Sequence, residues 1–131
     1  MKYLLDTAVW LWSIDSIERI SKVGREVLEN RQEEIYFSAA VAWELSIKAR
    51  LGKLSLPSPP AHCIPAFMEK QALRALPVTQ LHAIKVYDLP LHHQDPFDRI
   101  IIAQAIAEDM TILTADRIFE RYPAELVWCG R

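Results

Sequence analysis

Four acidic residues stand where the sequence passes from one structural pattern to the next. Asp6 follows the apolar run "KYLL", Asp98 lies in the first turn of the segment opened by "DPFD", and Asp116 comes two residues after "TILT". Glu44 lies within the apolar segment "AAVAWELSIKARLG". Acidic side chains that meet at one apolar edge repel each other and require a counter-charge. A hard divalent cation such as Mg²⁺ or Mn²⁺, which prefers carboxylate and water oxygens, would supply it.

Each aspartate also has a local explanation as a helix cap. Asp6 and Asp116 each precede a helical pattern, where a side-chain oxygen can accept a hydrogen bond from a free backbone N–H. In "DPFD", Asp95 fits the N-cap position, Pro96 the first helical position, and Asp98 an acidic position favoured by the helix dipole. We assign Asp95 to capping alone, and for Asp6, Asp98 and Asp116 both explanations stay open.

Glu44 is harder to explain locally, because its neighbours on one helix face, Ala40, Val41, Ile47 and Leu51, are apolar and predict a core-facing side. A buried carboxylate is costly unless it meets a cation, is protonated, or opens onto a polar cleft. Lys48, one turn further along, offers the alternative of an ion pair within the helix.

The elements that position these residues alternate between short apolar strands and amphipathic helices. Strands are predicted at residues 2–5, 34–38, 73–78, 111–114 and 125–128. Helices are predicted at residues 8–14, 21–32, 39–52, 61–71, 79–89, 96–109 and 115–122, with Ser21 and Ser38 as caps and Gly52 marking the end of the third. This alternation predicts an α/β fold with a parallel sheet between helices. Right-handed crossovers place the carboxyl ends of the strands at one edge, which is where Asp6, Asp98 and Asp116 would meet.

Length and composition predict one globular domain over residues 1–131. The net charge of −2 means that a nucleic-acid partner would need a local basic patch. Cys63 and Cys129 lack the spacing of a zinc site or a disulfide framework, so a reducing cytoplasm is the expected location. Asp6 interrupts the apolar start in a way that a signal peptide would not. No apolar run reaches the roughly 18 residues of a membrane-spanning helix.

Basic and imidazole side chains near the acidic positions are weaker indicators. Lys48 and Arg99 are candidates for holding the phosphates of a nucleic-acid substrate, although basic residues on helices are usually only solvated. The pair His92 and His93 does not predict a transition-metal site, because adjacent residues point in different directions and no third His or Cys is suitably spaced. We expect the pair to line the mouth of the acidic site or to occupy the loop before Asp95.

Trp10 and Trp12 are two positions apart on the first predicted helix, so they cannot both face the core. We therefore expect an apolar patch on this helix. It would serve self-association into a homodimer or the docking of a partner helix.

The contexts of the four acidic residues resemble those of a known family. The segments "LLDT", "SAAVAWELSIK", "FDRIIIAQA" and "TADRIF" resemble the PIN-domain nucleases, and in detail the VapC toxins of bacterial toxin–antitoxin pairs. The segments "WELSIKARLGKL" and "LPLHHQDPFDRIIIAQA" are especially similar to that subgroup, and the resemblance extends from residue 2 to about residue 128.

The resemblance implies a PIN-like α/β/α sandwich with a central, mainly parallel sheet of four to five strands. It also implies a Mg²⁺- or Mn²⁺-dependent endoribonuclease that a VapB-type antitoxin neutralises. The residues that match the metal-site positions of the family are Asp6, Glu44, Asp98 and Asp116, and Thr114 matches a supporting polar position.

Hydrolysis at such a site would use water made more acidic by the cation, and the products would carry a 5′-phosphate and a 3′-hydroxyl. Two other functions compete with this one. The first is a catalytically silent PIN-fold module that binds RNA or a protein. The second is a phosphoryl-transfer domain of the receiver or dehalogenase type, which the absence of a second aspartate beside Asp6 disfavours.

Overall fold

The computed structural model describes residues 1–131 and contains one five-stranded parallel sheet in the order β3-β2-β1-β4-β5. The strands are β1 (Lys2–Leu5), β2 (Glu34–Ser38), β3 (Arg74–Leu76), β4 (Thr111–Thr114) and β5 (Leu126–Trp128). Helices cover both faces, which confirms the predicted α/β/α fold. None of these helices is both long enough and apolar enough to cross a membrane.

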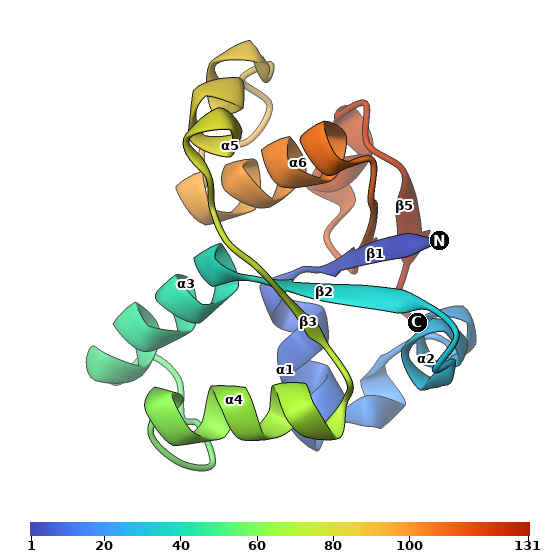
Figure 1. Ribbon diagram of the computed structural model, residues 1–131, viewed down its shortest axis with the longest axis vertical. Helices are drawn as coiled ribbons and strands as arrows, with labels where there is room; N and C mark the ends of the chain where they lie inside the picture. Colours follow the sequence, from blue (N-terminus) through green and yellow to red (C-terminus); the bar gives the residue numbers. More distant parts are fainter.

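The helices divide between the two faces of the sheet. The α-helices are α1 (Thr7–Asp15), α2 (Lys22–Glu29), α3 (Ala39–Arg50), α4 (Pro60–Lys70), α5 (Gln80–Lys85) and α6 (Pro96–Glu108). Short 3₁₀ helices are η1 (Ile17–Arg19), η2 (Val86–Asp88) and η3 (Arg117–Arg121). Figure 1 shows α1, α2 and α4 below the sheet and α5 and α6 above it. The chain therefore changes face after β3 and returns to pair β4 with β1.

The central strands β1 and β4 set the position of the site. Their register pairs Leu5 with Leu113, and the next backbone N–H, that of Asp6, donates to Leu113 O over 3.1 Å. Leu5 and Leu113 are fully buried, so the apolar side chains of both strands anchor this register. Asp6 and Thr114 consequently emerge next to each other at the carboxyl edge, where the strand order reverses.

Side chains cap the helices where the sequence predicts it. Asp6 accepts from Val9 N–H, Ser21 from Gly24 N–H and Ser38 from Ala40 N–H, at the starts of α1, α2 and α3. Gly52 has a φ of 74°, the left-handed conformation that favours glycine after a helix. These predicted boundaries are confirmed, because capping depends on atoms only a few residues apart.

Several predicted elements are shorter than expected. The helix predicted over residues 79–89 ends at Lys85 and continues as η2, and the helix predicted over 115–122 is the 3₁₀ helix η3. The strand predicted over 73–78 is reduced to Arg74–Leu76 at the edge of the sheet. Short segments gain few backbone hydrogen bonds, so tertiary contacts decide their form.

The first helix buries one tryptophan fully and the other partly. Trp10 has no exposed surface and packs edge-on against Phe37 and Phe67, whereas Trp12 is half-buried beneath the Arg19 guanidinium. Trp12 also packs against the margin of the core, so one tryptophan is buried and the other lies nearer the surface, as predicted. The expected apolar patch is displaced, because strongly exposed apolar side chains lie on α3 and α5, at Trp43 and Leu81 among others, and not on α1.

Candidate active site

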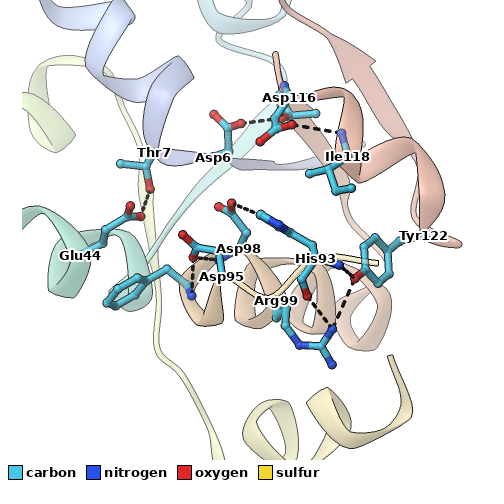
Figure 2. Close-up of polar contacts among 12 residues, drawn as sticks. Asp6, Thr7, Glu44, His93, Asp95, Asp98, Arg99, Asp116, Ile118 and Tyr122 are labelled. Atoms are coloured by element: carbon cyan, nitrogen blue, oxygen red, sulfur yellow. Dashed lines mark hydrogen bonds and ion pairs between the residues drawn. The ribbon is translucent and has the colours of Figure 1, made fainter. Parts of the chain in front are cut away.

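The carboxyl edge of the sheet contains a polar cavity of about 240 Å³. Its walls come from α1, α3, α6 and the segment after β4, and it is lined by Asp6, Thr7, Ala8, Leu11, Glu44, Lys48, Asp95, Asp98 and Asp116. All four acidic residues that the sequence predicted for the site therefore reach one cavity. Figure 2 shows Asp6, Asp98 and Asp116 turned toward a common space, with Glu44 beside it.

Asp6 occupies the centre of this edge and is 4% exposed. Its Oδ1 accepts from Val9 N–H over 2.8 Å, and its Oδ2 accepts from the Thr114 hydroxyl. Thr114 is fully buried, and its hydroxyl oxygen also accepts from Asp116 N–H over 3.1 Å. A single threonine thus connects the two aspartates that follow β1 and β4.

Glu44 is 5% exposed and uses both carboxylate oxygens. Oε1 accepts from the Thr7 hydroxyl over 2.6 Å, and Oε2 lies 2.5 Å from Lys48 Nζ. The ion pair within the helix therefore exists, and Glu44 still lines the cavity. The ion pair with Lys48 and the position at a polar cleft, which were alternative explanations for Glu44, therefore apply at the same time.

At the start of α6, Asp95 caps the helix and Asp98 faces the cavity. Asp95 Oδ1 accepts from Phe97 N–H and Asp98 N–H over 2.9 and 3.1 Å, so its capping role is confirmed. Asp98 Oδ2 lies 2.7 Å from His93 Nε2. The Asp98 side chain thus points into the cavity from a helix whose cap is supplied by a different residue.

Asp116 is exposed and begins η3, where its Oδ1 accepts from Ile118 N–H over 3.0 Å. One ligand atom each from His93, Asp98 and Asp116 lies within 4.8 Å of the others. Asp116 therefore both caps a short helix and faces the same space as Asp98.

The electrostatics of the cavity favour a cation. Burial raises the pKa of Asp6 to about 7, with Asp98 and Asp116 adding repulsion. Burial likewise raises the pKa of Asp98 to about 6, opposed by the hydrogen bond from His93. Lys48 is the one basic residue lining the cavity, and its hydrogen bond to Glu44 raises its own pKa. Five carboxylates against one ammonium form an oxygen-rich donor set that fits a hard divalent ion.

Arg99 requires a correction. It is only 8% exposed, and its guanidinium donates to five acceptors within the protein. These are Val86 O, Leu89 O, Pro90 O, His93 O and Tyr122 Oη. All the acceptors belong to the loop before α6 or to Tyr122, so Arg99 supports that loop and the prediction that it contacts RNA phosphate is wrong.

Two site residues were not assigned from the sequence. Thr7 directly follows Asp6 and could have been inferred from the same strand-end argument. His93 was expected near the mouth of the site, but its proximity to Asp98 could not be foreseen because the loop is irregular. His92 is exposed and lies edge-on to Tyr122, with ring centroids 5.4 Å apart.

Part of this chain is similar in sequence to a known protein. Ribonuclease VapC16 of Mycobacterium tuberculosis is 38% identical over 58 residues, which cover 44% of this chain and 41% of that relative. The alignment therefore spans less than half of the relative's length.

Solved structures with a similar fold match nearly the whole chain. A chain of VapBC2 from Rickettsia felis, bound to a promoter DNA fragment, has a TM-score of 0.74 at 20% identity, covering 99% of this chain and 100% of that one. A chain of DNA-bound VapBC from Salmonella typhimurium has a TM-score of 0.69 at 21% identity, covering 97% of each. These neighbours share the fold. The PIN domain family model matches residues 3–125, and the chain therefore belongs to the PIN domain family.

Proposed function

We propose that this protein is a divalent-metal-dependent endoribonuclease of the VapC toxin type, acting as one domain over the whole described chain. The observation that carries the proposal is the cavity at the carboxyl edge. Four acidic side chains from separate parts of the chain line it, and Lys48 is its single basic residue. The partial identity to a ribonuclease supports the same activity. RNA as substrate implies a cytoplasmic site of action.

Asp6, Asp98 and Asp116 would hold the cation, with Glu44 as a further ligand or as the residue that orients water. When bound, Mg²⁺ or Mn²⁺ makes water more acidic and offsets negative charge on the scissile phosphate and the departing oxygen. The acidic cavity would repel RNA in the absence of the cation.

The residues around the carboxylates hold them in place for this chemistry. Thr114 and Val9 N–H fix the two oxygens of Asp6, and Thr7 with Lys48 fixes those of Glu44. Lys48 keeps 42% of its side chain exposed, so its ammonium can also approach a phosphate oxygen at the mouth of the cavity. We retain Lys48 as the substrate-binding candidate. Thr114 acts through Asp6 as a positioning residue.

A VapB-type antitoxin is the proposed partner, since chains of this fold occur in complexes described as VapBC. A cleft of about 280 Å³ runs beside the end of α1 and is lined by Ser13, Ile17, Leu28, Glu29, Arg31, Lys70, Gln71 and Leu73. Its mixed apolar and charged lining suits an amphipathic segment of such a partner.

We assign self-association to a different surface, the apolar hollow. This hollow of about 280 Å³ is lined entirely by Ala39, Ala40, Trp43, Val78, Phe97 and Ile100. Trp43 is 61% exposed and packs edge-on against Phe97 with ring centroids 5.0 Å apart. A wholly apolar, open depression on a protein surface marks an interaction site. We propose that a second copy of the chain covers it in a homodimer.

A catalytically silent PIN module is the alternative function. The intact set of acidic residues in one cavity disfavours it, because a module that only bound RNA would be opposed by these charges.

The deciding experiment compares cleavage of structured RNA by the full chain and two variants, Asp98→Asn and Asp109→Asn. Asp109 is a matched control, because it lies at the far end of α6 with a φ of 55°, a conformation that asparagine tolerates. We expect cleavage with Mg²⁺ or Mn²⁺, none with EDTA, and products with 5′-phosphate ends. Asp98→Asn should lower the rate by about 100-fold or more, roughly 2.7 kcal/mol of transition-state stabilisation, and Asp109→Asn should not. Equal cleavage by all three proteins, or no cleavage with any divalent ion, would exclude the proposal.

A further inference from the structure

His93 places an imidazole nitrogen against a carboxylate of the site. Its Nε2 lies 2.7 Å from Asp98 Oδ2, and one ligand atom each of His93, Asp98 and Asp116 falls within 4.8 Å of the others. Atoms on opposite sides of one small divalent ion are roughly 4.2 Å apart, because each bond is about 2.1 Å. The three residues therefore need only small side-chain adjustments to share one ion.

The backbone around His93 is fixed to the helix that carries Asp98. His93 N–H donates to Tyr122 Oη over 2.9 Å, and His93 O accepts from Arg99 Nη1 over 3.1 Å. Tyr122 Oη in turn donates to Pro90 O over 2.9 Å. Arg99 directly follows Asp98 in α6, so the buried guanidinium ties the position of the imidazole to that of the carboxylate (Figure 2).

This arrangement is more elaborate than orienting Asp98 requires. Asp98 already lies on a capped helix, and any hydrogen-bond donor at position 93 would be sufficient to orient its carboxylate. The imidazole is instead held where it faces a second carboxylate, that of Asp116, from another element. A neutral nitrogen ligand also adds no negative charge to a cavity that already contains five carboxylates.

We infer that His93 is a nitrogen ligand of the cation, beside Asp98 and Asp116, so that the site is a mixed nitrogen and oxygen site. This inference rests on the proposed metal-dependent function. Its chemical consequence is metal preference. Imidazole suits transition metals, whereas Mg²⁺ prefers oxygen ligands. The site therefore favours Mn²⁺ over Mg²⁺, and His93 accounts for the preference.

The test measures Mn²⁺ binding to the full chain by electron paramagnetic resonance, with Mg²⁺ affinity obtained by competition. The variants are His93→Gln, whose amide can still donate to Asp98, and His92→Gln as the neighbouring control. We expect His93→Gln to weaken Mn²⁺ binding by about tenfold or more and Mg²⁺ binding by no more than about threefold. His92→Gln should leave both affinities unchanged.

A second measurement does not depend on any variant. Pulsed electron paramagnetic resonance of Mn²⁺ bound to the unmutated protein should show coupling to a histidine nitrogen, and the coupling should change when histidine carries ¹⁵N. Mn²⁺ binding without nitrogen coupling, or with equal affinity in His93→Gln, would overturn the inference and leave the proposed nuclease intact. If the unmutated protein bound no divalent ion and cleaved no RNA, both would be rejected.

Discussion

The Thr7 hydroxyl donates a hydrogen bond to Glu44 Oε1 over 2.6 Å, joining the first residue of α1 to the middle of α3. The bond is buried and connects residues 37 positions apart. Through it, the segment that carries Asp6 and the helix that carries Glu44 share one wall of the cavity. The relationship makes Thr7 the simplest residue with which to test how the site is held.

Thr7→Val should destabilise the protein by about 1.5–3 kcal/mol, because it removes a buried hydrogen bond to a charged group. Valine nearly preserves the shape of threonine, so the loss reports the hydroxyl and not the packing. Thr7→Ser restores the hydroxyl and should recover most of the stability. Urea unfolding of the three proteins measures the difference. Equal stability of the Val and Ser variants would show that the bond contributes nothing.

The stability of the cation-free protein should fall as the pH rises from about 4 to about 7. The pKa of Asp6 is raised from 3.8 to about 7 and that of Asp98 from 3.8 to about 6, because burial disfavours their charged forms. A raised carboxyl pKa means that the folded state binds the proton more tightly than the unfolded state. The stabilisation is therefore complete below the unfolded pKa and is lost as the pH rises through the folded value.

Each unit of difference between the folded and the unfolded pKa corresponds to about 1.4 kcal/mol, so the total loss of stability should reach several kcal/mol. Urea unfolding in EDTA across this range measures it. Asp6→Asn removes the largest contribution and should flatten the profile. A stability that increases with pH in this window would contradict the assignment of both groups.

Saturating Mg²⁺ or Mn²⁺ should raise the melting temperature, because the ion binds the folded site and not the unfolded chain. At 100 times the dissociation constant the gain is about 2.7 kcal/mol. Asp98→Asn should raise the melting temperature of the metal-free protein by relieving repulsion, and should reduce the response to the ion. Asp109→Asn should behave as the unmutated protein. Calorimetry with and without EDTA tests the pattern, which fails if the ion leaves the melting temperature unchanged.

Arg99→Lys should destabilise the protein by about 2 kcal/mol or more, because lysine cannot satisfy the acceptors that the guanidinium fork reaches. The effect should concentrate in residues 86–93, whose carbonyl groups lose their donor. Hydrogen exchange measures this, and we expect faster exchange in that loop. Arg117→Lys, at an exposed position, is the control. Unchanged exchange in the loop would reject the supporting role of Arg99.

Trp43→Lys should convert a homodimer into a monomer, because it places a charge in the apolar hollow. The chain mass is 15.1 kDa, so light scattering should report twice that value for the unmutated protein and the single value for the variant. Tyr87→Lys changes an apolar side chain that is 92% exposed but does not line the hollow, and should remain dimeric. A monomeric unmutated protein would reject the assignment of this surface.

The parts of the fold that depend on local interactions could be predicted well from the sequence. The caps Asp6, Ser21, Ser38 and Asp95 begin helices as expected, since each acts on backbone groups two or three residues away. The extent of short elements was less predictable. The predicted helix over 115–122 became a 3₁₀ helix, because a segment of five residues gains little from helical hydrogen bonds alone.

The site was predictable where topology alone decides the position. Asp6 and Thr114 end neighbouring parallel strands, so the crossover rule is sufficient to bring them together. Arg99 was mispredicted for the opposite reason. An arginine after an acidic residue in a sequence suggests a phosphate contact, but the loop over residues 86–93 turns its carbonyl oxygens inward and captures the guanidinium.

By itself, the sequence determined the order of strands and helices along the chain and the residues that cap the helices. It also determined which acidic residues lie at strand ends and helix starts, and therefore at one edge of the sheet. Only the tertiary structure decided that His93 faces Asp98, that Arg99 is buried, and that the exposed apolar surface lies at Trp43 and not on α1. The physical reason is the distance along the sequence over which each interaction acts. Periodicity and capping act between residues a few positions apart, whereas these features depend on which groups burial brings together, as with Thr114 and Asp6, 108 positions apart.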